Sequence, residues 1–171
     1  GLMDNMTNQA AGFGRSVLYG LRVHVIVRET EAKAKAYAQY LISDLDLNQG
    51  DEIRNRAQDS KSLGVSRQSE LRDSADEDYF VEPNLWTGVG LARSGCGAAI
   101  VGNPDQVYDK IQRYIKMGIR SFIFSGYPHK QEANYFADLV LPRLKTVSLP
   151  EVLGRIPKET PNTPLEKGPR I

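Results

Sequence analysis

Apolar and polar positions alternate most clearly in residues 21–27, LRVHVIV. Side chains of a strand point alternately to its two faces, so this pattern predicts a buried strand with two different faces. The face that we expect helices to cover comprises Leu21, Val23, Val25 and Val27. The other face carries Arg22 and His24 beside Ile26. Since charged groups are seldom buried unless they are paired or functional, Arg22 and His24 are candidate site residues.

A helix is predicted directly after this strand, over residues 31–42. Thr30 can cap its first turn, and Glu31 favours the positive end of the helix dipole. Apolar side chains recur at helical spacing, as Ala36, Tyr37, Tyr40 and Leu41. We interpret this stripe as core or interface positions rather than cofactor contacts.

The C-terminal half of the chain predicts a second strand between two helices. Residues 104–117 have apolar side chains at helical spacing, with Asn103 as the cap. Residues 119–125, IRSFIFS, read as a buried strand, and residues 130–141 as a last helix. A short apolar run at residues 98–101 precedes the first of these helices, and we do not count it as a strand.

Two segments lack such periodicity. Residues 44–97 are polar and densely charged at first and glycine-rich from residue 88 onward, which predicts a surface insertion with a deformable second part. Trp86 would anchor the base of this loop by packing. Residues 146–171 hold five of the nine prolines and predict an extended or disordered tail. We therefore assign residues 1–145 to one domain.

Composition limits the function classes. The chain has 171 residues, and 22 basic residues balance 21 acidic ones, which argues against an extended nucleic-acid or membrane-surface interface. No apolar run is long enough to span a bilayer. One cysteine and two histidines argue against a disulfide framework and against a metal site. We expect a cytoplasmic protein without nucleic-acid or membrane partners.

The alternation of strands and helices predicts an α/β fold with parallel strands. Two parallel strands cannot form a stable sheet that is buried on both faces. We therefore expect further strands elsewhere, including residues that precede Gly1.

Three segments occur in the same order in a known family. They read GLRVHVIVRETEAKAKAYAQYLIS, PNLWTGVGLARSGCGAAIVGNPDQVYDKIQRYIKMGIRSFIFSGYPH and EANYFADLVLPRL. Together they resemble the C-terminal part of the alkanesulfonate monooxygenases, in the bacterial luciferase-like family of flavin-dependent monooxygenases. The resemblance implies the C-terminal portion of a (β/α)8 TIM barrel, with residues 21–27 and 119–125 as its last two barrel strands. It also implies that residues 44–97 form a mobile insertion that closes over the site.

The resemblance implies an activity as well. Members of this family use O2 and reduced FMN, which a separate NAD(P)H-dependent FMN reductase delivers, to cleave the carbon–sulfur bond of an alkanesulfonate into an aldehyde and sulfite. A homo-oligomer, either a dimer or a tetramer, is implied for the full-length protein. The family's preceding portion supplies six strands and most flavin contacts, so the resemblance assigns no cofactor-binding residues to this chain.

Four residues match functional positions of the family. Arg22 and His24 match the strand pair at the sulfonate and flavin site. Arg93 matches an arginine on the mobile loop, and Tyr127 the tyrosine after the last strand. The resemblance thus implies catalytic roles for Arg22, His24 and Tyr127, and substrate contacts by Arg22, Arg93 and Tyr127. A guanidinium group suits a sulfonate, whose oxygens it can bind bidentately.

Other interpretations stay open at this point. Arg22 can pair with a structural carboxylate, His24 can be a core histidine, and Arg93 can be a surface charge. The chain can be a truncated, non-catalytic piece that needs a complementary partner, since it offers two strands where a closed barrel has eight. It can also belong to a luciferase-like enzyme for another substrate, such as an alkane or a sulfone. Two arginines favour an anionic substrate.

Overall fold

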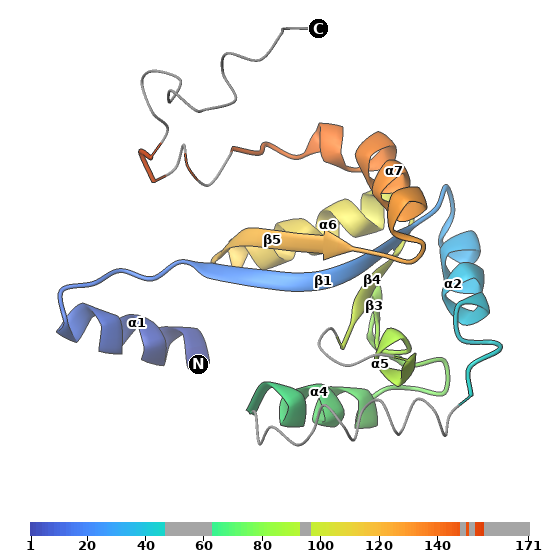
Figure 1. Cartoon of the computed structure of the whole chain (residues 1–171), viewed down its shortest axis with the longest axis horizontal. Helices are drawn as coiled ribbons and strands as arrows, with labels where there is room; N and C mark the ends of the chain where they lie inside the picture. Colours follow the sequence, from blue (N-terminus) through green and yellow to red (C-terminus); the bar gives the residue numbers. More distant parts are fainter. Residues whose placement is uncertain (47–62, 93–96, 148–149, 151–152, 156–171) are drawn as a thin grey trace, which may run out of the picture.

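The computed structural model describes residues 1–46, 63–92, 97–147, 150 and 153–155. The strands are β1 (Tyr19–Val27), β2 (Phe80–Glu82), β3 (Leu85–Trp86), β4 (Ala99–Gly102) and β5 (Ile119–Ser125). The helices are α1 (Leu2–Gly12), α2 (Glu31–Tyr40), α4 (Leu63–Asp73), α5 (Val89–Ala92), α6 (Pro104–Lys116) and α7 (His129–Leu139), followed by the 3₁₀ turn η1 (Leu141–Arg143). The strands form one sheet in the order β2-β3-β4-β1-β5 (Figure 1).

The long strand β1 lies between two parallel neighbours, β4 and β5. Both predicted strands are confirmed, and they pair with each other directly. The expected count of two parallel strands was wrong, because the short apolar run forms β4. All four residues of β4 are buried, so the run shows no alternation by which a strand can be recognised. Parallel strands that alternate with helices agree with the predicted portion of a (β/α)8 barrel.

The two faces of β1 pack into different apolar clusters. The predicted apolar face of β1 is confirmed, since it packs against α6 and α7 through Val107, Ile111, Phe136 and Val140. On the opposite face, Ile26 packs with Ala34 and Ala38 of α2 and with Trp86. In Figure 1, α6 runs behind β5 and β1, whereas α2 lies beyond the end of β1.

Helix α2 begins as predicted, because the Thr30 side chain accepts a hydrogen bond from the Lys33 amide at 3.2 Å. Of the predicted stripe, Tyr37 and Leu41 pack against the cluster of Ile26, but the fully buried residues are others. Ala34 and Ala38 are fully buried, whereas Tyr40 is 67% exposed and Ala36 is exposed too. Two alanines one turn apart let the helix backbone approach the sheet more closely than tyrosines would, and this decides which side faces inward.

Part of the predicted surface insertion joins the sheet. The β2–β3 hairpin pairs antiparallel with β4, and Trp86 is fully buried, which confirms it as a packing anchor. A Cβ atom on Gly88 would lie 2.2 Å from the Trp86 ring, so glycine is required there. Lys110 of α6 also binds the hairpin, since its Nζ donates to Glu82 Oε1 at 2.6 Å and to the Pro83 carbonyl at 2.8 Å. Most of the predicted tail, residues 146–171, lies outside the described residues.

The remaining helices differ in how well the sequence predicts them. Asn103 caps α6 in a reciprocal pair with Gln106, as its position before Pro104 predicts. Helix α7 begins and ends within two residues of its prediction. Helix α1 was not predicted, because it buries none of its residues and so leaves no apolar stripe. None of the described helices is long and apolar enough to cross a membrane.

Candidate functional site

Strand β1 carries Arg22 and His24 on one face, as predicted, but in different surroundings. In the parallel register with β5, Arg22 lies beside Ile123 and His24 beside Ser125. Arg22 is exposed, whereas only 2% of His24 is exposed. The face is therefore open at Arg22 and becomes covered toward the carboxyl end of the strand.

The His24 ring is held beside the carboxyl end of β5, three residues before β1 ends. Its Nδ1 lies 3.0 Å from Ser125 Oγ, a hydrogen bond that fixes the ring whichever atom donates. Its Nε2 is fully buried. The Tyr127 ring stacks on it, with the ring centroids 5.3 Å apart and the planes 29° from parallel. The structure thus brings His24 and Tyr127 together, and sequence reasoning missed Ser125, which only the strand register reveals.

The turn after β5 places Tyr127 between two histidines. The His129 ring lies 4.8 Å from the Tyr127 ring, on α7, and its Nδ1 contacts the Gly126 carbonyl. A Cβ atom on Gly126 would lie 2.5 Å from Glu132 Cβ and 3.1 Å from the Val25 carbonyl, so only glycine allows this turn to pack against α7 and β1. The Tyr127 ring thus contacts both imidazoles at the carboxyl end of β5.

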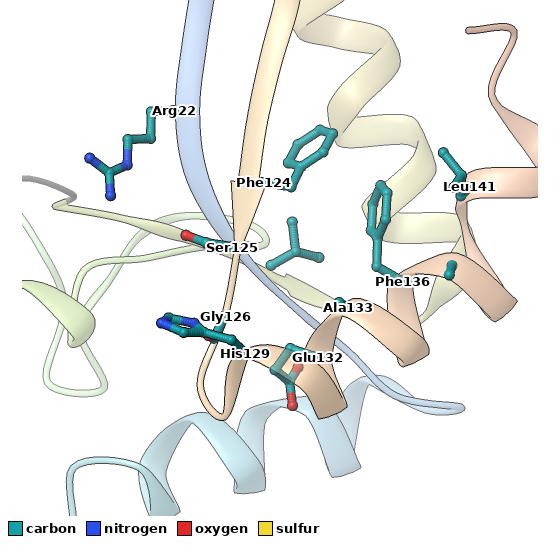
Figure 2. A pocket seen from close by; sticks show the side chains of 11 residues that line it. Arg22, Phe124, Ser125, Gly126, His129, Glu132, Ala133, Phe136 and Leu141 are labelled. Carbon is teal, nitrogen blue, oxygen red and sulfur yellow. The ribbon is translucent and has the colours of Figure 1, made fainter. Parts of the chain in front are cut away.

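A pocket of about 470 Å³ lies along β5. It is lined by Arg22, Val25, Phe124, Ser125, Gly126, His129, Glu132, Ala133, Phe136, Ala137 and Leu141. Figure 2 shows Arg22, Ser125 and His129 on one side of β5, and Phe124 and Phe136 on the other. Successive residues of a strand alternate, and β5 is the outermost strand of the described sheet, so the pocket reaches both faces. Its polar side chains are Arg22, Ser125 and His129, together with Glu132 of α7.

A buried ion pair lies behind the turn. Arg28 and Glu132 are 7% and 3% exposed and contact each other twice, Nη2 to Oε1 at 2.6 Å and Nη1 to Oε2 at 3.0 Å. Burial by itself would lower the pKa of Arg28, but hydrogen bonding to the Glu132 carboxylate and its charge raise that pKa above its usual value. Sequence reasoning missed Arg28. Its place directly after a strand, where barrel enzymes carry functional groups, was the signal that could have found it.

Arg93, the remaining predicted site residue, lies outside the described residues. The described segments on either side of it are anchored on one face of the sheet. Val89 precedes it and Ala99 follows it, and both pack in the cluster of Ile26, two residues beyond His24 on the same face of β1. The described residues Val89 and Ala99 therefore lie on the face that carries His24.

These groups are chemically suited to an anion and to oxygen chemistry. Arg22 offers a permanent positive charge at the open part of the face. Tyr127 offers an O–H group that can donate a hydrogen bond to an oxygen atom, whereas the Nδ1 of His24 is bound to Ser125 and its Nε2 is buried. The aromatic rings and the imidazole, rather than a cluster of carboxylates, also suit a planar organic cofactor beside the anion.

Comparison with known proteins identifies the family. Residues 1–121 match the model of the family described as "Luciferase-like monooxygenase". A sulfoquinovose monooxygenase from Agrobacterium fabrum is 59% identical over 162 residues, which cover 95% of this chain and 42% of that protein. One from Novosphingobium aromaticivorans is 58% identical over 140 residues, 82% of this chain and 39% of that protein. The chain thus spans about two-fifths of the length of these curated relatives. It belongs to the luciferase-like monooxygenase family.

Proposed function

We propose that the protein containing this chain is a monooxygenase that uses reduced FMN and O2 to cleave the carbon–sulfur bond of an organosulfonate. The observation that carries the proposal is the shared face of β1 and β5, where Arg22 lies on the same side as the stacked His24 and Tyr127. In a member of this family, a cation beside hydrogen-bond donors favours a substrate with an anionic head.

The proposed reaction assigns separate tasks to these residues. Arg22 binds the sulfonate oxygens and holds the adjacent carbon in place. Tyr127 donates a hydrogen bond to the oxygen that is transferred, and buried His24, fixed by Ser125, holds the Tyr127 ring by stacking. Reduced FMN would supply the two electrons with which O2 oxidises the carbon next to sulfur. One oxygen atom ends in the aldehyde and the other in water, and the C–S bond breaks to release sulfite.

Among sulfonates, we propose sulfoquinovose as the substrate ahead of simple alkanesulfonates. The support is the identity of 59% and 58% to two proteins that bear the name sulfoquinovose monooxygenase. The sequence resemblance to alkanesulfonate monooxygenases points to the same bond cleavage on a plain alkyl chain. Sulfoquinovose is a hexose with a sulfonate group, so both substrates present the same anion to Arg22.

Further parts of the proposal rest on the family resemblance. A separate NAD(P)H-dependent reductase supplies the reduced FMN, and the full-length protein forms a dimer or a tetramer. The resemblance also implies that Arg93 binds the sulfonate. Because this chain spans about two-fifths of the length of its relatives, we expect residues 1–171 alone to be inactive.

The test is sulfite release by the full-length protein with FMN, NAD(P)H, a flavin reductase and O2. We expect sulfite from sulfoquinovose, less from a linear alkanesulfonate, and no product from an alkane or a sulfone. Higher turnover of the linear alkanesulfonate would show that it, and not sulfoquinovose, is the preferred substrate. Oxidation of a sulfone or an alkane without sulfite release from either sulfonate would refute the proposed reaction.

A further inference from the structure

The guanidinium of Arg28 has a second set of contacts besides Glu132. It lies between the Tyr37 ring of α2, 3.9 Å from Cζ to the centroid, and the Tyr135 ring of α7, at 4.3 Å. Its Nη1 also donates to the Val27 carbonyl at 2.8 Å. A planar cation stacked on both sides fixes the orientation of both rings, which a lysine would not do. Arg28 thereby joins β1, α2 and α7.

Tyr37 passes this orientation on to the site. Its hydroxyl donates a hydrogen bond to the backbone carbonyl of Tyr127 at 3.2 Å. The ring that stacks on Arg28 therefore also holds the backbone from which the Tyr127 side chain projects toward His24.

Glu132 holds the same turn from the other side. Its amide donates to the Pro128 carbonyl at 3.0 Å, and its Cβ packs against Gly126. The residues before and after Tyr127 are thus held by Glu132, and Tyr127 itself by Tyr37. Both of these holding residues are in contact with the one guanidinium of Arg28.

We propose that Arg28, Glu132 and Tyr37 are positioning residues that set the Tyr127 ring over His24. Their kinetic effect rests on the proposed function, whereas their effect on the geometry of the two rings does not. Loss of the unit displaces Tyr127 and slows the chemical step, while Arg22 still binds the sulfonate. A purely structural ion pair would alter stability without moving the Tyr127 ring.

The cleanest variant is Tyr37→Phe in the full-length protein, because it keeps the ring on Arg28 and removes only the hydroxyl that holds Tyr127. Tyr135→Phe is the matched control, since it removes a hydroxyl from the other ring of the same stack. Arg28→Lys is a second test, because it keeps the charge but loses the planar stack. Glu82→Ala removes a different ion pair, that of the buried Lys110 with the partly exposed Glu82, and controls for a general loss of stability.

The geometric readout is the NMR signal of the His24 imidazole protons in flavin-free protein labelled at histidine, assigned with His24→Asn. Because the Tyr127 ring stacks on His24, its movement changes the ring-current shift of those protons. We expect shifted His24 signals in Tyr37→Phe and Arg28→Lys, and unchanged signals in Tyr135→Phe and Glu82→Ala. Unchanged signals in Tyr37→Phe, or equal shifts in both phenylalanine variants, overturn the proposal.

The kinetic readout separates this inference from the proposed function. In sulfite release, Tyr37→Phe should lower kcat by about three- to ten-fold, the usual effect of one lost hydrogen bond, and leave KM within about two-fold. A wild-type protein that releases no sulfite refutes the proposed function, and the His24 signals then decide the inference alone. A change confined to KM contradicts the positioning role.

Discussion

Arg22 and His24 lie two residues apart on β1, yet burial gives them different roles. Arg22 is exposed and keeps a charge that a substrate can reach, whereas His24 is buried and fixed by Ser125. The sequence predicted that both share a face, because strand periodicity needs only local information. The partners of His24 were not predictable in this way. Ser125 comes from a strand about one hundred positions later, and only the pairing register places it beside the ring.

Burial of Tyr114 makes the free energy of unfolding depend on pH in the alkaline range. Burial raises the pKa of Tyr114 above its ordinary value, so the folded state holds this proton more tightly than the unfolded state. The contribution of Tyr114 to the free energy of unfolding is therefore fully present below about pH 10, the unfolded pKa, and is lost as the pH rises through the folded pKa. Tyr114→Phe should reduce this loss, as measured by urea unfolding between pH 9 and 11.

Tyr40→Phe is the control for this pH dependence, since the Tyr40 side chain is 67% exposed. The two variants should differ in how steeply the free energy of unfolding falls with pH, with a shallower fall in Tyr114→Phe. Identical slopes in both variants and in the wild type would contradict the assignment to Tyr114.

At the scale of elements, the sequence predicted those with local signals and missed those that form only by pairing with neighbouring strands. The amphipathic helix α6, with its Asn103 cap, was predicted almost to the residue because its signals are local. Strand β4 and the β2–β3 hairpin were missed, since they are short and depend on neighbours for their backbone hydrogen bonds. Trp86 was correctly predicted as an anchor, but its role in extending the sheet depends on β4.

Lys110 holds the β2–β3 hairpin in addition to its backbone pairs and the buried Trp86. The Lys110 side chain is 4% exposed and that of Glu82 44%, so Glu82→Ala leaves a buried ammonium group with only the Pro83 carbonyl. We expect Glu82→Ala to cost about 3 kcal/mol, and Lys110→Met to stay within about 1 kcal/mol, because methionine refills the space and water solvates Glu82. The free energy of urea unfolding compares the two variants.

Trp86 reports on the hairpin, since it is the only tryptophan and is fully buried. Its fluorescence in Glu82→Ala should shift to longer wavelength at urea concentrations where the far-ultraviolet circular dichroism is still native. A single transition at the same urea midpoint by both probes would show that the hairpin does not open separately.

At the scale of the whole molecule, the described sheet has an outer strand, β5, that carries both apolar and site residues. Ile123 is 61% exposed on the face of Arg22, and Met117 just before β5 is 68% exposed. The sequence predicted that two strands are too few for a stable sheet; the structure adds β4 and a hairpin but still leaves β5 at an edge.

The exposed edge predicts that residues 1–171, produced alone, associate with one another. An outer strand with unpaired backbone groups and apolar side chains pairs readily with other chains. Ile123→Lys should reduce the association, while Val147→Lys, at another exposed apolar residue, should not. Light scattering after size-exclusion chromatography gives the mass. A monomer that unfolds cooperatively would contradict this expectation.

The central claim, that the Arg22 face of β1 binds a sulfonate beside His24 and Tyr127, is tested most directly by one comparison. It is the kcat/KM for sulfite release from sulfoquinovose by full-length Arg22→Met and Arg120→Met. Arg120 is an exposed arginine of β5 that donates to the Ile115 carbonyl. We predict a loss of about 10- to 100-fold in Arg22→Met, as expected when a charge-assisted hydrogen bond is removed, and none in Arg120→Met. Wild-type kcat/KM in Arg22→Met would contradict the account.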